Sequence, residues 1–182
     1  MVCMRMLQRE LAIRVSSFVD EMKLIVPDLK AYLRTVYPKA EVVLMSQDKA
    51  KPDYPYVGYT LTSTTPRSRR KTVTDGGLLD VVEELSTVND VSYSFSGISE
   101  DDEGAAGIAQ MANDYFSFIG EDNSKRHNIA YPYVSGVAQR NALIGDIQES
   151  RYGFDVVIRV ERTVAKDRRS IVAVGLDSSF NK

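Results

Sequence analysis

Strict alternation of apolar and polar residues predicts two strands in this chain. Successive side chains of a strand point to opposite faces, so every second residue shares a face. The apolar residues that alternate in this way are Val91, Tyr93 and Phe95 within residues 88–96, and Phe154, Val156, Ile158 and Val160 within residues 154–163. Each of these segments is therefore expected to bury one face and expose the other.

Other segments favour strands less regularly. Residues 54–63 are rich in aromatic and β-branched residues, and Pro55 restricts the start of this strand to an edge or entry position. Residues 41–46 form a short apolar run that suits a central strand, with a buried helical turn as the alternative. Residues 128–137 predict a further short strand or an extended arm.

A hairpin is predicted at the carboxyl end, where residues 170–176 are expected to pair with residues 154–163. The turn that joins them, residues 164–169, is basic. Its cations are Lys166, Arg168 and Arg169.

A second basic segment lies in residues 64–77, whose turn-forming residues predict an exposed, mobile loop that extends from the domain. Its cations are Arg67, Arg69, Arg70 and Lys71. Residues 78–84, which follow, fit a strand and a helical turn equally well.

Spacing of three or four residues between apolar positions predicts helices. Two of them lie in about residues 1–37: an amphipathic helix, and a second helix that begins at Pro27 and ends before Pro38. The apolar stripe of the first is Leu7, Leu11, Val15, Phe18 and Met22. A third helix is predicted from a capping-box start at Ser99 to Ile119, with Gly120 as its stop. Its expected inward residues are Ala105, Ile108, Ala109, Ala112, Phe116 and Ile119.

The order of these elements predicts an α+β fold, with a mainly antiparallel sheet and helices packed on one face. Strands and helices do not alternate regularly, as they would in a doubly wound parallel sheet. The length of 182 residues, with 43% apolar and 26% charged residues, suits one domain over residues 1–182.

Charge and cysteine content narrow the classes of partner and compartment. A net charge of −2 argues against binding to nucleic acid or an acidic membrane through overall charge. The single Cys3 cannot form an internal disulfide, and no apolar run approaches the roughly 18 residues that span a bilayer. We therefore expect a chain that is made in the cytosol and is not a membrane protein.

Residues that would carry catalysis or bind a cofactor or metal are not predicted. His127 is the only histidine and lies among polar residues, so a solvated loop is the expected setting. Cysteine and histidine clusters of the zinc type and glycine-rich phosphate loops are absent from the sequence. The acidic run Glu100, Asp101, Asp102 and Glu103 would offer oxygen ligands to a divalent cation, but a solvated helix start is favoured.

The two basic segments have three possible partners: phosphate, an acidic neighbouring subunit, or water alone. Because the same chain carries an acidic run, an acidic protein partner is preferred over phosphate. The seven cations of residues 67–71 and 166–169 are therefore the candidate interface residues.

Several motifs resemble the neck terminator proteins of tailed bacteriophages. They are YPYVGYTLTS at residues 54–63, VSYSFS at residues 91–96 before an alanine-rich helix, RNAL at residues 140–143, and ESRYGFDVVIRV at residues 149–160. The most specific of them is the strand start formed by Glu149, Arg151, Tyr152, Gly153, Phe154 and Asp155. The resemblance covers about residues 54–172.

The resemblance implies a tail-terminator-like fold that assembles as a homo-oligomeric, hexameric ring in the virion. Such a ring would lie between the head connector, or adaptor, and the tail tube, beside a sheath if the tail is contractile. Genomic DNA would pass through its channel without specific recognition, and no catalysis would be needed. Another head- or tail-completion ring protein is the alternative, and a small cytosolic enzyme or nucleic-acid-binding domain is a more distant one.

Two hypotheses concern single sites. Arg151 and Asp155 are expected to hold a structural salt bridge or hydrogen bond inside the subunit, which would explain why charged residues flank Tyr152, Gly153 and Phe154. The basic segment at residues 67–71 is expected to contact an adjacent ring.

Overall fold

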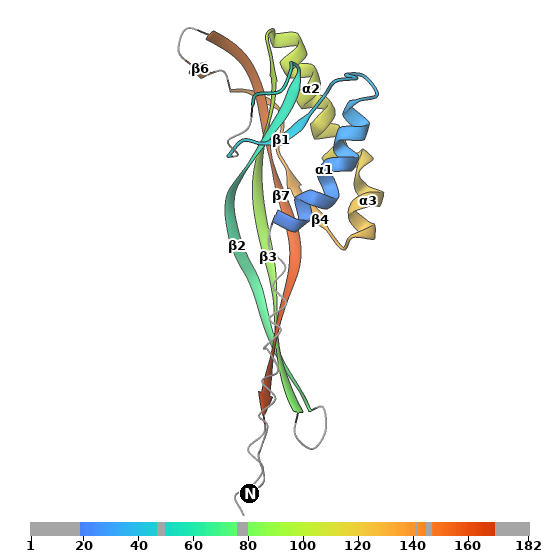
Figure 1. The fold of residues 1–182 in the computed structure, drawn as a ribbon, viewed down its shortest axis with the longest axis vertical. Helices are drawn as coiled ribbons and strands as arrows, with labels where there is room; N and C mark the ends of the chain where they lie inside the picture. Colours follow the sequence, from blue (N-terminus) through green and yellow to red (C-terminus); the bar gives the residue numbers. More distant parts are fainter. Residues whose placement is uncertain (1–18, 47–49, 76–79, 141, 145–146, 170–182) are drawn as a thin grey trace, which may run out of the picture.

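The sheet and the helices of this chain form an elongated molecule in a computed structural model. The structure describes residues 19–46, 50–75, 80–140, 142–144 and 147–169. The elements in chain order are α1 (Val19–Leu33), β1 (Val42–Leu44), β2 (Tyr56–Asp75), β3 (Asp80–Ser99), α2 (Asp102–Asp114), the π-helix η1 (Tyr115–Ile119), α3 (Glu121–Arg126), β4 (Ala130–Val134), β5 (Ala138–Gln139), β6 (Ala142–Ile144) and β7 (Ile147–Arg169). The long strands follow the long axis, and the helices cover one face of the upper part of the sheet (Figure 1). The predicted α+β fold is confirmed.

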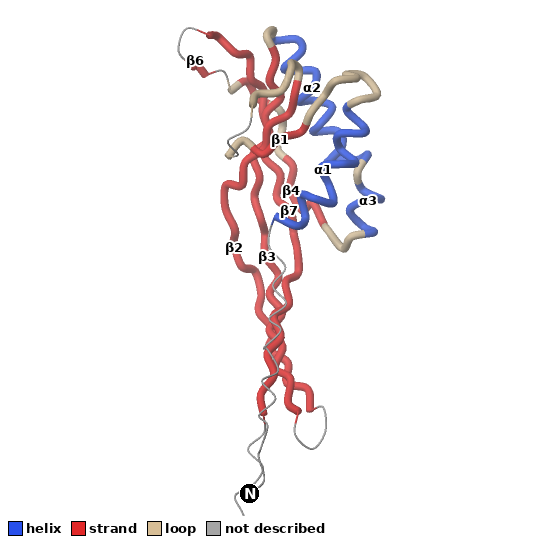
Figure 2. The backbone as a smooth tube through the Cα atoms, viewed as in Figure 1, coloured by secondary structure: helices blue, strands red, loops and turns tan. Residues whose placement is uncertain are grey.

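The strand order of the main sheet is β1-β2-β3-β7-β4, and β5 and β6 also pair with β7. Within the described residues β1 and β2 form a parallel pair, and the other pairs are antiparallel. β3 and β7 pair without a register shift from Asp80 opposite Arg169 to Ser99 opposite Ser150. Figure 2 shows these strands continuing well below the helices.

The hydrophobic core lies between the upper part of the sheet and the helices. Phe95 of β3 stacks on Phe154 of β7 with ring centroids 5.4 Å apart, and its ring lies 4.7 Å from that of Phe116 of η1. The alternating residues predicted for the two strands are buried, as expected from their spacing. The buried residues that α1 contributes are Met22, Ile25, Leu29 and Leu33.

One continuous helix replaces the predicted break at Pro27. α1 runs from Val19 to Leu33 with Pro27 inside it, and residues 7–18 of the predicted first helix lie outside the described residues. The missing N–H of Pro27 removes one hydrogen bond of the helix. Because buried residues on both sides of Pro27 lie on one stripe against the core, packing holds the helix together across this position.

The third predicted helix is confirmed, with two differences. Its cap is Asp101, whose side chain accepts a hydrogen bond from the backbone N–H of Gly104 at 2.6 Å, whereas Ser99 is the buried last residue of β3. The last turn is a π-helix, which shifts the inward face because it holds more residues per turn. Tyr115 is therefore buried beside Phe116, and Ile119 is 48% exposed.

The two predicted basic turns are strands in the structure. Residues 64–75 continue β2, which pairs with β3 as far as Asp75 opposite Val81, so the prediction of a mobile loop is wrong for them. Residues 164–169 continue β7, and the proposed pairing strand at residues 170–176 lies outside the described residues. The strand at residues 64–73 was not predicted because these residues are exposed on both faces of the sheet and so show no apolar alternation.

Three smaller predictions have clear outcomes. Residues 80–84, which fitted a strand or a helical turn, belong to β3. The apolar run at residues 41–46 contains the strand β1, which lies at the edge of the sheet and not in its centre. The predicted strand within residues 128–137 is β4.

Arg151 and Asp155 do not pair with each other. Four residues of a strand span about 13 Å, which is too far for a direct ion pair. Arg151 instead donates to Glu149, with Nη2 2.7 Å from Oε2, and Arg140 binds Asp155, with Nη2 3.0 Å from Oδ2. Each of these ion pairs joins two residues of the same chain.

The rest of the strand-start motif supports this region of the sheet. Glu149 is buried and also accepts hydrogen bonds from the Tyr54 hydroxyl at 2.7 Å and from Lys51. Gly153 leaves room for its neighbours, because a Cβ there would lie 2.7 Å from the carbonyl oxygen of Phe95. Phe154 is fully buried in the core.

Candidate interaction surface

The lower part of the sheet is a three-stranded extension that we call the finger. It comprises residues 65–75 of β2, 80–90 of β3 and 159–169 of β7, which pair side by side. No helix of the described chain covers it (Figure 1). The finger is therefore a single layer of sheet, whereas a stable sheet ordinarily packs against a second layer.

Exposure of β2 is the clearest sign of this single layer. Every side chain from Thr60 to Val73 is exposed, whichever face of the sheet it points to. In the upper part of the same strand Tyr56 and Val57 are buried. A long strand that is exposed on both faces offers its surface to something outside the described chain.

Asp90 joins the three strands at the base of the finger. Its carboxylate accepts hydrogen bonds from Nε and Nη2 of Arg159 at 2.8 and 3.1 Å, and from Nε of Arg67 at 2.6 Å. The side chain of Asp90 is only 6% exposed, while those of the two arginines are 43% and 62% exposed. Hydrogen bonding from Arg159 and then Arg67 outweighs the opposite effect of burial and lowers the pKa of Asp90 to about 2.

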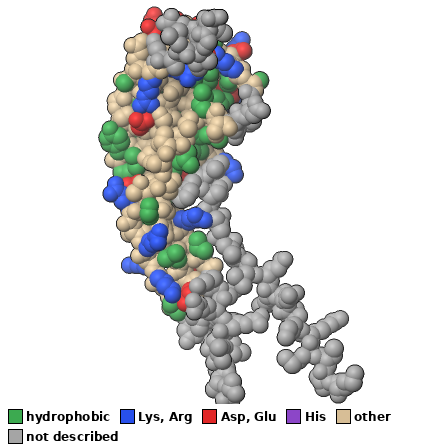
Figure 3. All heavy atoms as spheres, turned by 90° about the vertical axis from the view of Figure 1, so that its left-hand side faces the viewer, with side chains coloured by type: hydrophobic (Ala, Val, Ile, Leu, Met, Phe, Trp, Pro, Cys, Tyr) green, Lys and Arg blue, Asp and Glu red, His purple; other side chains and the backbone are tan. Residues whose placement is uncertain are grey.

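The free side of β2 is basic. Between Tyr59 and Asp75 this strand carries four cations and no acidic residue. Arg67 is bound to Asp90, and the ammonium group of Lys71 lies 3.3 Å from the carboxylate of Glu83. Figure 3 shows basic side chains spaced along the narrow lower part of the molecule on its β2 side.

Arg69 and Arg70 differ from the other two cations. They have no ion-pair partner within the part of the chain that the structure describes, and both are exposed. Because successive residues of a strand alternate, they point to opposite faces of the finger. Arg69 shares its face with Lys71, and Arg70 shares the other with the hydroxyl pair of Ser86 and Thr163, whose oxygens are 2.9 Å apart.

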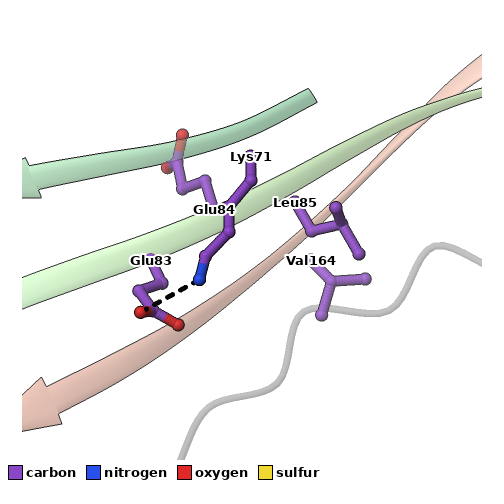
Figure 4. Close-up of a pocket in the computed structure, with 5 residues that line it drawn as sticks. All are labelled: Lys71, Glu83, Glu84, Leu85 and Val164. Atoms are coloured by element: carbon purple, nitrogen blue, oxygen red, sulfur yellow. Dashed lines mark ion pairs between the residues drawn. The ribbon is translucent and has the colours of Figure 1, made fainter. Parts of the chain in front are cut away.

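An apolar hollow of about 310 Å³ lies on the face of Lys71. Figure 4 shows Leu85 and Val164 side by side in it, next to the ion pair of Lys71 and Glu83, and Glu84 completes its lining. Lys71, Leu85 and Val164 are direct neighbours on three adjacent strands. Leu85 is 40% exposed, so this hollow can accept an apolar group from outside.

A second cavity, of about 260 Å³, lies between η1, α3 and β4. It contains the exposed ion pair of Lys125 and Glu121, with 2.7 Å between the charged atoms. His127 follows α3 and is exposed, and Cys3 lies outside the described residues. The described residues hold no group of three or more histidine, cysteine or acidic side chains arranged for a metal ion.

Comparison with known families decides what kind of protein this is. A family model described as phage neck terminator protein matches residues 16–179. The chain belongs to this family. A search of the curated proteins found no match.

Neck terminator proteins are structural components of the phage neck, so membership places the chain in the virion, in association with other virion proteins. The match is wider than the resemblance over residues 54–172, and it includes α1 and the whole finger. None of the described helices is long and apolar enough to cross a bilayer.

In this neck terminator the finger brings together both basic segments that the sequence singled out. Arg67, Arg69, Arg70 and Lys71 lie on β2, and Lys166, Arg168 and Arg169 lie on β7, with β3 between the two strands. Lys166 is opposite Glu83, which in turn is opposite Val73. The two segments were predicted as separate tips, and the structure places them at the same end of the molecule.

Five other members of this surface were not predicted as site residues. They are Glu83, Leu85, Asp90, Arg159 and Val164. A signal for them is present in the sequence, because an acidic segment at residues 80–84 would pair well between two basic strands.

Proposed function

We propose that this neck terminator forms a homo-oligomeric ring, a hexamer, between the head connector and the tail tube of a tailed phage. The ring ends the tail, joins it to the head and leaves a channel through which genomic DNA passes without specific recognition. The observation that carries the proposal is the family match over residues 16–179. The chain acts by shape and by contact with its neighbours, in the host cytoplasm during assembly and then in the virion.

The surfaces of the subunit support assembly into a ring. A closed ring of identical subunits needs two different and complementary surfaces on each subunit. The sheet offers two such sides, because β1 and β2 lie at one edge while β4 lies at the other. The two sides differ in their strands, since β1 forms the edge beside the upper part of β2, whereas β4, with the 56% exposed Tyr133, forms the other edge.

Another ring protein that completes the head or the tail remains the alternative function. Both proteins would be rings of the virion, and their position along the particle separates them. The neck position is supported here by the description of the family, which refers to the neck.

Cryo-electron microscopy of the neck of particles that contain this chain tests the proposal. We expect six copies in one ring, between the connector and the first ring of the tail tube. The proposal is wrong if the chain lies in the capsid shell or along the tube, or if purified particles lack it.

A further inference from the structure

We propose that the β2 side of the finger binds a segment of a different virion protein, in which carboxylates flank an apolar side chain. This inference rests on the proposed function, because it names the kind of neighbour that the ring contacts through the finger. Its basis is the combination of unpaired cations on both faces with an apolar hollow on the face of Arg69 and Lys71.

Cations without partners define the charge of the bound segment. Arg69 and Arg70 are exposed and have no ion pair within the described residues. An acidic partner would add charge-assisted hydrogen bonds to both guanidinium groups. Since the two side chains point to opposite faces, the partner has to contact both faces of the finger. It therefore wraps around the β2 edge.

The apolar hollow favours a protein over a nucleic acid as the occupant. Leu85 and Val164 lie on the same face as Arg69 and Lys71. Phosphates of DNA would meet the cations but would leave these two apolar side chains without a partner. A protein segment with an apolar residue between carboxylates satisfies both features.

Side-chain contacts, and not strand addition, are expected to hold the segment. The edge of β2 contains Pro66, which lacks an N–H, and two irregularities of register, between Leu61 and Ser63 and between Pro66 and Ser68. Proline, bulges and basic residues are the features by which edge strands resist pairing with another strand. The cations and the hollow are therefore expected to bind the partner through its side chains.

A second copy of this chain in the same ring does not fit this surface. Its most acidic run is Glu100, Asp101, Asp102 and Glu103, all exposed at the start of α2. Figure 1 places that start at the end of the long axis opposite to the finger. In a ring whose axis runs parallel to the long axis of the subunit, neighbouring copies lie at the same height, so the finger of one copy does not reach the acidic run of the next.

Zero-length cross-linking in assembled particles identifies the occupant. The double variant Arg69→Lys with Arg70→Lys keeps both charges and adds two amines, which a carbodiimide joins to carboxylates in direct contact. We expect mass spectrometry to find these lysines joined to an acidic segment of another virion protein. Lys39, an exposed lysine of the body, serves as the control position. Links to another copy of this chain, or no more links than Lys39 forms, would overturn the proposal.

Charge reversal and loss of the apolar side chain test the two features separately. Arg69→Glu with Arg70→Glu should lower plaque yield about tenfold or more in complementation, because like charges then face each other across the contact. Lys39→Glu with Arg126→Glu makes the same change of charge on the body and should leave the yield unchanged. Leu85→Ser should lower the plaque yield. Leu61→Ser is the control and should not, because Leu61 is exposed to a similar degree, at 43% against 40% for Leu85.

The state of the particles separates failure of this inference from failure of the proposed function. If the finger binds as proposed, tails that carry the charge-reversed chain retain the ring but do not join the virion protein that the finger binds. If the variant particles are complete, the finger inference is wrong and the ring stands. Binding of labelled duplex DNA by the full chain that disappears on reversal, with no cross-link to a protein, would assign the surface to nucleic acid instead.

Discussion

Asp90 is the residue that links the body of the molecule to the finger. It lies where β3 leaves the core, one residue from the buried Val91, and two arginines from the flanking strands hold its carboxylate. A buried carboxylate is unfavourable unless it is paired and hydrogen-bonded, and here it is both. The cluster therefore fixes the relative positions of β2, β3 and β7 at the base of the finger.

Removing the charge of Asp90 should destabilise the fold at neutral pH and not in acid. The folded pKa of about 2 lies below the value of 3.8 for a free aspartate, so the ion pairs stabilise the folded state above about pH 4 and are lost as the pH falls towards 2. For Asp90→Asn we expect the free energy of unfolding to fall by about 1–2 kcal/mol at pH 7. The lower end of this range is expected because the arginines are half exposed, so solvent weakens the ion pairs. Urea unfolding of both proteins at pH 7, 4 and 2.5 measures the difference.

The arginines provide an internal control for this prediction. Arg159 donates two hydrogen bonds to Asp90 and Arg67 donates one, so Arg159→Gln should reduce the acid dependence more than Arg67→Gln does. A stability difference between Asp90→Asn and the parent that stays constant from pH 7 to 2.5 would show that the charge is not the cause.

α2 approaches β3 closely at Gly97. A Cβ at Gly97 would lie 2.6 Å from the carbonyl oxygen of Ala105 and 2.7 Å from the backbone nitrogen of Ala109. Backbone atoms cannot move aside as a side chain can. Glycine on the strand and alanines on the helix therefore set the distance between the two elements.

Gly97→Ala should destabilise the fold, because the helix must shift away from the sheet. Overpacking of this kind costs about 1–3 kcal/mol, which lowers the midpoint of thermal unfolding by roughly 3–9 °C in a chain of this size. Gly136→Ala is the matched control, since a Cβ there meets nothing within 4 Å. Equal midpoints for the two variants would mean that α2 does not pack on β3 as closely as described.

How far the sequence predicted the elements depended on how each element is buried. β7 and the upper part of β3 were predicted because one face packs on the helices, which leaves a period of two in the apolar residues. The finger part of β2 was predicted as a loop because both of its faces are exposed, so its residues carry no such period. Pro27 was predicted to begin a helix because a local rule was applied, whereas packing of the helix on the core overrides that rule.

The candidate site was predicted in part for the same reason. The exposed cations are visible in the sequence as two basic runs, but their position on one finger depends on pairing between strands far apart in the chain. Glu149 lies two residues before Arg151 on the same face of β7, so this partner could have been found from the sequence, whereas Arg140 reaches Asp155 only because the two segments lie side by side in the fold. Long-range pairing of this kind has no local sequence signature.

At the scale of the whole molecule, charge and burial divide along the long axis. The net charge of −2 hides an acidic run at the start of α2 and a basic strand on the finger at the other end. Among the described residues the buried core lies in the upper part, since its β2 and β3 residues are Tyr56 and Val57, and then Val91, Tyr93, Phe95 and Ile98, and it reaches the base of the finger only at Val160. Stability and interaction are therefore carried by different parts of one sheet.

A chain with a shortened finger should test this division. Replacing residues 67–88 by Asn-Gly joins Pro66 to Asn89, which are direct partners across the β2–β3 pair, through a two-residue turn. Because the side chains described in the deleted part contribute no apolar residue to the buried core, we expect a cooperative thermal transition within about 3 °C of the parent. Loss of a cooperative transition would mean that the finger is part of the folding unit, while a folded variant that still joins heads to tails would remove the finger from the junction.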